Sequence, residues 1–515
     1  GHEQMDEIHR SIASVPTNHT TWRLRLFMLI SFVDSVTLVT VVYVMLALVH
    51  ESTASGHAPP NFVLICADDV GYADLGCYGN EYHETPNIDR LMTDGLRFTQ
   101  AYADAPLCAP SRIALLTGRH CARAGCYDVF PKRIIEGVAP EQVDFVPPVN
   151  VWNLPAGRSI LPEYLKEIGY RTGCFGKWHV GPMMPGKRGF DEFVSLRTTS
   201  HTDVSQSLIG RSKGSLAPEG YSSDYITKCA VQFIDKHQDE PFFLYLPHTL
   251  VHSAKNGRAG LDPKPELLAK DQAKSKTELH RNPAYAAMIE AVDQAVGRTM
   301  KALRTHGLLE NTLVIFTSDN GGVLGRRRVT NSGVIAGHIT SNYPLRSGKL
   351  HLFEGGVRVP MSISYGGILN AGMVSDAVVS QLDFLRTFLE LAGHPQAKAI
   401  GEIIDGKSLV PLLRDAEATW PDRELFWHYP GYRILNAATM AGQRPESSMR
   451  HGKWKVIESL ETGAVQLYDL KTDVSEANDV AAAHPEVVSR LRRRLKQWRE
   501  ETNAPMPVRK DAPSH

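Results

Sequence analysis

Short apolar segments alternate with helical patterns through the middle of this 515-residue chain, and this alternation limits the folds that the chain can adopt. The apolar segments have the length and the aromatic or β-branched content of buried strands. They are residues 61–67, 171–175, 241–247 and 312–317, and the helical patterns cover residues 85–98, 161–170 and 284–307. Strands that alternate with helices predict an α/β fold, in which helices cover both faces of a large, mostly parallel sheet.

Polar residues follow each of the four predicted strands. In chain order they are Asp68 and Asp69, the segment GKWHVG (176–181), His248 and His252, and the segment SDNGG (318–322). The carboxyl ends of parallel strands lie along one edge of a sheet, and ligands bind there. We therefore expect these residues to form one site, although Asp69 and Asp319 are far apart in the sequence.

The acidic residues at two of these strand ends indicate a metal site. Asp68, Asp69, Asp319 and Asn320 offer only oxygen ligands, which suit Ca²⁺ or Mg²⁺ better than zinc. Either acidic segment alone could be a simple turn. Two such segments at equivalent strand ends favour a metal.

The charge balance excludes some functions and predicts a local anion pocket. Lys plus Arg and Asp plus Glu both number 56, so the chain lacks the basic excess that is typical of nucleic-acid binding. A protein of this composition that binds an anion must gather its positive charge locally. Arg112, Lys177 and Lys349, together with His252, are the candidates.

The segment CAPSRIALLTGR (108–119) places a cysteine where a helix is about to begin. Pro110 suits the first turn of a helix, so Cys108 is expected at the N-terminus, where the helix dipole stabilises negative charge. A thiolate nucleophile is one interpretation and a buried structural cysteine is the other. Cysteine phosphatases have an arginine six residues after the cysteine, and Ala114 occupies that position here.

The first 57 residues differ from the rest of the chain. Arg23 and Arg25 precede an apolar run over residues 26–49, which predicts either a cleaved signal peptide or a retained membrane anchor. In both cases we expect the rest of the protein to be exported to the periplasm or the extracellular space. The seven cysteines leave at least one unpaired even if disulfides form there.

The segment CAPSRIALLTGR resembles the signature of the type I sulfatases, in which the cysteine of C-x-P-S-R is oxidised to formylglycine. Further segments resemble blocks of that family in the same order, namely residues 67–79, 85–91, 176–181, 241–252, 316–322, 348–360 and 467–481. The resemblance spans about residues 60 to 500. It implies an alkaline-phosphatase-like catalytic domain over residues 58–420 and a small C-terminal subdomain over residues 421–515, with an antiparallel sheet and a helix at 485–501.

The resemblance also implies a role for each candidate residue. Asp68, Asp69, Asp319 and Asn320 would hold Ca²⁺, or less typically Mg²⁺, beside an oxygen of residue 108. The hydrated aldehyde of residue 108 would attack sulfur, and its second hydroxyl would then expel sulfate. Arg112 would fix the hydrate and His179 would hydrogen-bond its second hydroxyl. Lys177 and Lys349 would bind sulfate oxygens, while Lys349 and His252, rather than His248, would protonate the leaving oxygen. Glu354 and Arg358 are interpreted as structural.

The family resemblance predicts an exported sulfuric ester hydrolase that acts on a sulfated saccharide in preference to an aryl sulfate. Its maturation would need a formylglycine-generating or an anaerobic sulfatase-maturing enzyme. The alternatives are a phosphonate monoester or phosphodiester hydrolase of the same fold, and a tethered binding protein that has lost catalysis. Substrate choice is expected in loops 201–220 and 326–328. His428 could line a sugar pocket but is better explained as a packing residue. The arginines of helix 485–501 are better explained as a solvated surface than as a nucleic-acid or glycan site.

Overall fold

The computed structural model describes residues 58–511 apart from a few short segments. Those segments are residues 256–259, 325–326, 331–332, 337–338, 367–368, 370, 417 and 437–440, and for 327–330, 333–336, 435–436 and 441 the backbone alone is described. Residues Pro59–His515 form one compact unit. The predicted signal or anchor (1–57) and the side chains of the arginine run at 326–328 lie outside the described residues. No helix within the described ranges is long and apolar enough to cross a bilayer.

The described part of the chain contains one large mixed sheet of nine strands in the order β14-β2-β13-β10-β1-β9-β6-β7-β8. Their bounds are β1 (Asn61–Ala67), β2 (Leu96–Phe98), β6 (Arg171–Gly176), β7 (Glu192–Leu196), β8 (Leu208–Arg211), β9 (Phe242–Pro247), β10 (Thr312–Ser318), β13 (Met361–Tyr365) and β14 (Met373–Ser375). The central strands β10, β1, β9, β6 and β7 are parallel, whereas β13 and β8 are antiparallel to their neighbours β10 and β7. The four strands predicted from the sequence are therefore confirmed.

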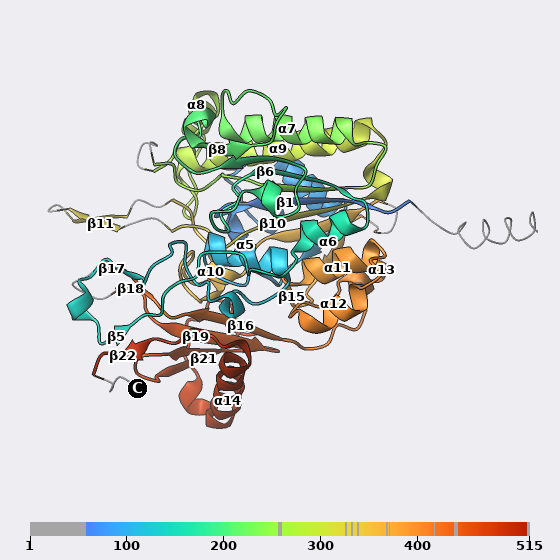
Figure 1. Cartoon of the computed structure of the whole chain (residues 1–515). Coiled ribbons are helices and arrows are strands. Elements are labelled where there is room, and N and C mark those ends of the chain that lie inside the picture. Colours follow the sequence, from blue (N-terminus) through green and yellow to red (C-terminus); the bar gives the residue numbers. More distant parts are fainter. Residues whose placement is uncertain are drawn as a thin grey trace, which may run out of the picture. The chain divides into compact units, whose positions relative to one another are not determined.

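Helices cover both faces of this sheet (Figure 1). One layer contains α4 (Pro86–Thr93), α7 (Ser222–Lys236), α8 (Pro265–Gln272) and α9 (Pro283–Thr305). The other contains α5 (Cys108–Thr117), α6 (Leu161–Glu167), α11 (Asp383–Leu391), α12 (Ala397–Ile403) and α13 (Val410–Arg414). Alternate residues of β1 enter separate cores, with Val63 and Ile65 on one face and Phe62 and Leu64 on the other. A strand that is buried on both faces explains why its sequence is continuously apolar.

The helix predicted over residues 85–98 is too long. In the structure α4 ends at Thr93, and Leu96–Phe98 forms strand β2. Gly95 lies directly against β13, where a Cβ atom would come within 2.4 Å of the Ile363 carbonyl oxygen. This close approach requires glycine and lets the chain enter the sheet immediately after the helix.

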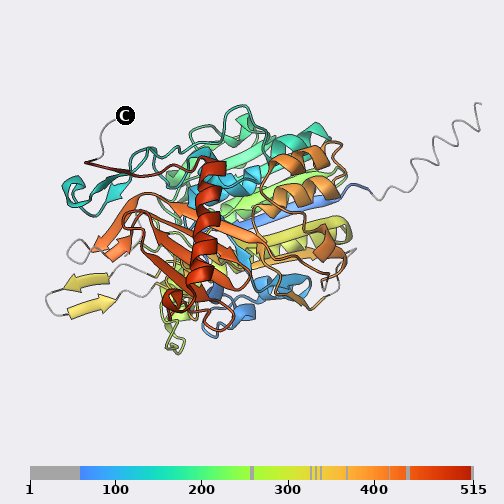
Figure 2. The same cartoon turned by 90° about the horizontal axis from the view of Figure 1, so that it is seen from below.

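A smaller antiparallel sheet follows in the C-terminal part, as predicted. It contains β16 (Glu424–Tyr429), β19 (Glu446–His451), β20 (Trp454–Ser459) and β21 (Val465–Asp469). Helix α14 (Pro485–Thr502) lies across these strands (Figure 2) and buries Leu491, Leu495 and Trp498 against them. The domain boundary near residue 420 remains a prediction from the sequence.

Short elements complete the described structure. They are β3 (Ala101–Tyr102), β4 (Ile135–Glu136), β5 (Phe145–Val146), β11 (Arg327–Thr330), β12 (Gly333–Ala336), α10 (Glu354–Val357), β15 (Val379–Ser380), β17 (Tyr432–Asn436), β18 (Ala441–Gln443) and β22 (Val508–Arg509). His428 on β16 is buried, and its ring nitrogens lie 2.7 Å from Ser447 Oγ and 2.9 Å from the Pro505 carbonyl oxygen. It is a packing histidine and does not line a sugar pocket.

His120 connects the catalytic core to the C-terminal sheet and should make stability depend on pH. Its Nδ1 lies 2.6 Å from Asp104 Oδ1, and its ring packs edge-on against Phe426 and Trp498. Burial alone would lower the pKa of His120, but the Asp104 carboxylate outweighs burial and raises the pKa above 6.5. This stabilisation is complete below pH 6.5 and is lost as pH rises through the folded-state pKa.

We therefore expect the free energy of unfolding to fall as pH rises above about 6.5, with a slope of at most about 1.4 kcal/mol per pH unit from this one group. His120→Gln should remove that component, which urea unfolding of both proteins across pH 5.5–9 would measure. An unchanged slope in the variant would contradict the assignment.

Candidate active site

The polar residues that follow the parallel strands meet at one edge of the sheet. The last residue of β1, Ala67, pairs with Ser318 at the end of β10, so Asp68 and Asp319 emerge side by side. The Asp319 amide donates to the Ala67 carbonyl, and the Asp69 amide lies 3.2 Å from Asp319 Oδ1. Asp68, Asp69 and Asp319 therefore lie together at the carboxyl edge of the sheet, as expected from their positions after the predicted strands.

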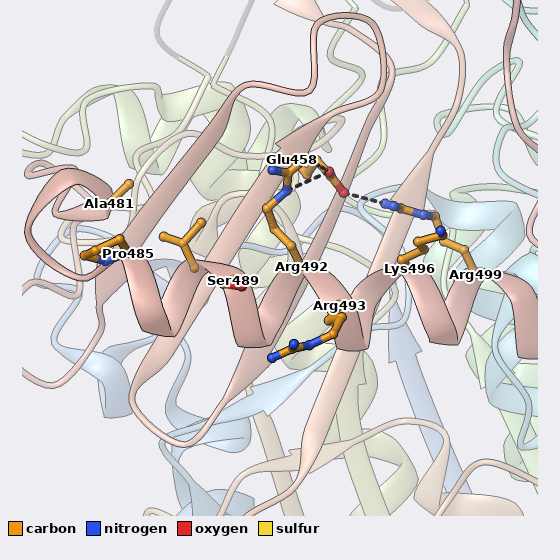
Figure 3. Close-up of a pocket in the computed structure, with 9 residues that line it drawn as sticks. Glu458, Ala481, Pro485, Ser489, Arg492, Arg493, Lys496 and Arg499 are labelled. Atoms are coloured by element: carbon orange, nitrogen blue, oxygen red, sulfur yellow. Dashed lines mark hydrogen bonds and ion pairs between the residues drawn. The ribbon is translucent and has the colours of Figure 1, made fainter.

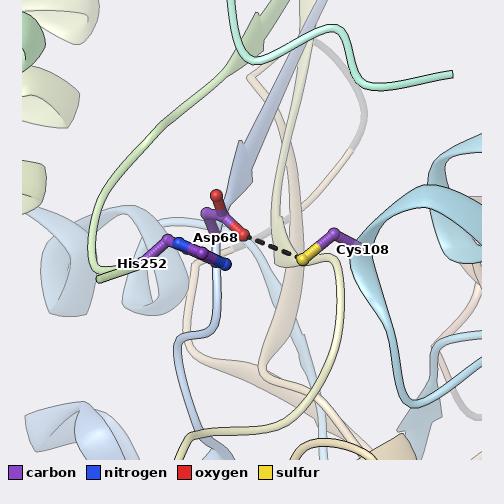
Figure 4. A group of neighbouring side chains, drawn as sticks. All are labelled: Asp68, Cys108 and His252. Carbon is purple, nitrogen blue, oxygen red and sulfur yellow. Dashed lines mark hydrogen bonds between the residues drawn. The ribbon is translucent and has the colours of Figure 1, made fainter. Parts of the chain in front are cut away.

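Four side chains converge closely enough to hold one metal ion. One ligand atom from each of Asp68, Asp69, Cys108 and Asp319 lies within 4.8 Å of the others. All four residues are buried. Asp68, Cys108 and His252 form a second, overlapping group, drawn in Figure 4.

Asn320 fits the same metal site through its side-chain oxygen. Its Nδ2 donates to Asp69 Oδ1 at 2.8 Å and to the Gly321 carbonyl at 3.0 Å. Its Oδ1 is buried and finds no hydrogen-bond donor within the described structure. A buried acceptor without a donor is costly unless something else satisfies it. With the three carboxylates, Asn320 makes a donor set of the hard oxygen type that Ca²⁺ and Mg²⁺ prefer.

Three cations pair with the three carboxylates. Lys177 Nζ lies 2.6 Å from Asp68 Oδ2, Lys349 Nζ lies 2.6 Å from both Asp69 oxygens, and Arg112 Nη2 lies 2.7 Å from Asp319 Oδ2. Burial would raise the pKa of Asp69, but Lys349 and its neighbours hold that pKa well below 3.8. The cations that the sequence analysis singled out therefore gather at this edge of the sheet, each beside a carboxylate, and their role in binding an anion stays a prediction.

Cys108 is the first residue of α5, and its Sγ points into this cluster. Sγ lies 3.3 Å from Asp68 Oδ1, 3.7 Å from Asp69 Oδ1 and 3.3 Å from Lys349 Nζ. Burial, followed by the Asp319 and Asp68 carboxylates, raises the pKa of the thiol well above 9.0. Burial and these carboxylates therefore disfavour the thiolate form of Cys108, whereas the position at a helix N-terminus favours it.

The surroundings of the site histidines favour their neutral form, because burial lowers the pKa of each. His252 Nε2 lies 3.9 Å from Asp69 Oδ2, whereas the ring of His248 is fully buried and neither of its nitrogens has a hydrogen-bond partner among the described residues. Burial and the nearby Lys177 and Lys349 lower the pKa of His252 well below 6.5. Burial and the same cations also lower the pKa of His179. The His179 Nδ1 is buried and has no hydrogen-bond partner within the described ranges.

A supporting hydrogen-bond network was not predicted from the sequence. Asp74 Oδ2 accepts hydrogen bonds from the Gly71 amide at 2.7 Å and from Tyr285 Oη at 2.6 Å, which fixes the turn after Asp69. In the sequence, the one indication of this role is that Asp74 is a third acidic residue soon after Asp68 and Asp69. Gln381 donates to the Ser318 carbonyl at 2.6 Å, and no local pattern in the sequence indicates this contact.

Residues 201–220, expected to form a loop that carries substrate choice, include strand β8, and the buried His201 at their start contacts the backbone of His252. A ring nitrogen of His201 lies 2.9 Å from the backbone oxygen of His252. Glu354 and Arg358 are structural, as expected, because both side chains bond within the fold, to Tyr102 and to the Thr99 carbonyl respectively.

Comparisons with known proteins identify the family. The sequence model of the Sulfatase family matches residues 60–394, and that of the N-sulphoglucosamine sulphohydrolase C-terminal region matches residues 347–501. A protein named "Sulfatase" from Formosa agariphila is 32% identical over 88% of this chain and 91% of its own length. Human arylsulfatase A is 35% identical over 73% of this chain and 71% of its own length.

A solved structure supports the same assignment. The crystal structure of Ps i-CgsB in complex with k-i-k-neocarrahexaose has a TM-score of 0.68 and 29% sequence identity, and covers 85% of this chain and 92% of that one. The relatives favour hydrolysis of sulfate esters over hydrolysis of phosphonate or phosphate esters. The chain belongs to the sulfatase family and is an enzyme that hydrolyses sulfate esters.

Proposed function

We propose that this sulfatase removes sulfate from a sulfated carbohydrate, with a formylglycine made from Cys108 as its nucleophile. One observation carries the nucleophile: residue 108 begins α5 with its Sγ 3.3 Å from Asp68 Oδ1, 3.7 Å from Asp69 Oδ1 and 3.3 Å from Lys349 Nζ, within the proposed metal and sulfate site. The carbohydrate substrate is supported by the neocarrahexaose complex of the related structure.

Formylglycine would supply, as its hydrate, one oxygen that attacks sulfur and a second hydroxyl whose deprotonation releases sulfate. Arg112 is fully buried and anchored by Asp319 and by the Lys177 carbonyl at 2.7 Å, so it is positioned to orient residue 108. The unpaired, buried Nδ1 of His179 can hydrogen-bond the second hydroxyl and take its proton.

The substrate sulfate would bind between Lys177 and Lys349. Their side chains are 5% and 13% exposed, so water screens their charges little. The negative charge of a bound sulfate would offset both lysines and raise the pKa of His252. His252 and Lys349 would then protonate the alcohol oxygen as the bond between that oxygen and sulfur breaks.

We place a Ca²⁺ ion on Asp68, Asp69, Asp319 and Asn320, with Mg²⁺ as the less suitable ion. When bound, the metal supplies positive charge that stabilises the negative charge developing on the sulfate oxygens. The fit is supported by the oxygen donor set and by the unsatisfied Asn320 Oδ1.

Metal removal gives a direct prediction. Chelation should abolish turnover, and Ca²⁺ should restore it at lower concentration than Mg²⁺, because a multi-carboxylate site suits the larger ion. Asn320→Ala should weaken Ca²⁺ binding by about tenfold or more, as measured by calorimetric titration of the chelated protein. Full activity after exhaustive chelation would contradict the metal site.

We further propose that residues 1–57 direct export to the periplasm or the extracellular space, with residues 26–49 as a signal or a membrane tether. The maturation partner would be a formylglycine-generating or an anaerobic sulfatase-maturing enzyme. Fractionation of the native host with an antibody against the protein would test the location, and a cytoplasmic soluble pool alone would refute it.

The mass of the proteolytic peptide that contains residue 108 tests the nucleophile. Protein made together with a formylglycine-generating enzyme should show the aldehyde or its hydrate, and an unmodified thiol under those conditions would refute the mechanism. Matured enzyme should then hydrolyse sulfated saccharides faster than 4-nitrophenyl sulfate, and both faster than a phosphonate monoester. A reversed order would refute the substrate assignment.

A further inference from the structure

A groove with four cations among its nine lining residues runs along α14, where this helix packs on the C-terminal sheet (Figure 3). Its volume is about 510 Å³. The lining residues are Glu458, Ala481, Pro485, Val488, Ser489, Arg492, Arg493, Lys496 and Arg499. Four cations therefore face one carboxylate, in a chain whose formal net charge is zero.

The one carboxylate in the groove fixes two of its arginines. Glu458, which is 7% exposed, accepts from Arg492 Nη2 at 2.7 Å and from Arg499 Nη1 at 2.8 Å. Arg492 also donates from Nε to Glu458 at 3.0 Å, and its side chain is 43% exposed, so its remaining N–H donors can reach a ligand more easily than those of Arg499, which is 12% exposed. The pair is thus held in place by Glu458 while keeping a surplus of positive charge.

The other two cations, Arg493 and Lys496, are exposed, and only Lys496 has an ion-pair partner within the described residues. The Lys496 side chain is 72% exposed, and its Nζ makes a long ion pair of 3.9 Å with Glu500 Oε1. On the helix, residues 489, 492, 493 and 496 follow the i, i+3, i+4, i+7 spacing of a single face. Arg492, Arg493 and Lys496 therefore lie on one face of α14, where Arg492 points toward Glu458 of β20 and Arg493 points away from it (Figure 3).

We infer that this groove is a second, non-catalytic site that binds the sulfated polysaccharide chain on which the enzyme acts. The inference rests on the proposed carbohydrate function. Its chemistry favours sulfate esters over a single-stranded nucleic acid, because none of the nine lining residues is aromatic and bases would have no stacking platform.

Binding of dextran sulfate to the matured, full-length enzyme tests the inference, with uncharged dextran as the blank. The variant Arg493→Glu/Lys496→Glu leaves Glu458 and its two partners intact. We expect it to weaken dextran sulfate binding roughly tenfold at low salt, and we expect salt to weaken binding by the unmodified protein. Turnover of 4-nitrophenyl sulfate should stay within about twofold, because neither residue belongs to the catalytic site.

A matched control reverses two exposed lysines in the helical layer of the large sheet, Lys228→Glu/Lys301→Glu on α7 and α9. This control should bind dextran sulfate within about twofold of the unmodified protein. Equal weakening by both variants, no weakening by the groove variant, or equally tight binding of an oligodeoxynucleotide of similar charge would overturn the inference. The binding assay needs no turnover. A failure of the sulfatase assay would therefore refute the proposed function, while dextran sulfate binding to the groove could still be measured and interpreted.

Discussion

Cys108→Ala is expected to lower kcat/KM for any sulfate ester by roughly 10⁴-fold or more, because removal of a covalent nucleophile leaves only binding and electrostatic stabilisation. Residue 108 lies at the start of α5 and within 3.7 Å of both Asp68 and Asp69, and no other cysteine lies in the metal-binding group. Initial rates with a sulfated saccharide at several concentrations would measure the loss.

Cys66→Ala is the matched control for this prediction. Cys66 is also fully buried, lies two residues before Asp68, and has a pKa that burial raises to about 12. Its thiol bonds only weakly to the Ala67 carbonyl and plays no part in the proposed chemistry. We expect its loss to cost less than tenfold in rate. Comparable losses in both variants would show that Cys108 acts through packing and not as the nucleophile precursor.

Lys455→Met is expected to destabilise the protein by about 3–5 kcal/mol, because it would remove a buried cation that two buried glutamates share. Glu354 would keep its ion pair with Arg358 at 3.4 Å, but Glu476 would lose Lys455 as its cation. Lys455 on β20 is fully buried, and its Nζ lies 2.9 Å from Glu354 Oε1 and 3.1 Å from Glu476 Oε1. Burial would raise the pKa of Glu354, but Lys455 holds it below 4.5. Urea unfolding, followed by fluorescence, would measure the change.

Two further variants test whether the loss of the buried Lys455 charge, and not the loss of a lysine in general, destabilises the protein. Lys453→Met removes a 46% exposed lysine that lies two residues earlier and pairs with Asp469, and it should cost less than about 1 kcal/mol. Adding Glu354→Gln and Glu476→Gln to Lys455→Met should recover much of the loss. Equal destabilisation by Lys453→Met and Lys455→Met would contradict the prediction.

The Lys455 cluster also connects the C-terminal sheet to the active site. Glu354 begins α10, and within that helix the Gly356 carbonyl accepts a hydrogen bond from the Gly321 amide at 3.0 Å, next to Asn320. The Gly355 amide donates to the Arg346 carbonyl at 2.9 Å, in the segment that carries Lys349. Lys455→Met should therefore reduce activity even at temperatures where the variant remains folded.

The sequence by itself determined four central parallel strands, the helical layers on both faces and the location of the site. Buried parallel strands such as Asn61–Ala67 are continuously apolar, and the polar residue that ends each one must lie at the carboxyl edge of the sheet. Asp68, Asp69, Asp319 and Asn320 could be grouped on that ground alone. Both inferences succeed because they depend on short-range patterns and on one general rule of sheet topology.

Only the tertiary structure decided the pairing of charges and the state of Cys108. Arg112, Lys177 and Lys349 pair with carboxylates that are distant in the sequence. The sequence around a carboxylate does not indicate which cation will pair with it in the folded protein. The helix start predicted a lowered pKa for Cys108, but burial and neighbouring carboxylates reverse it. Electrostatic effects depend on distance and solvent exposure, and both are fixed only when the chain is folded.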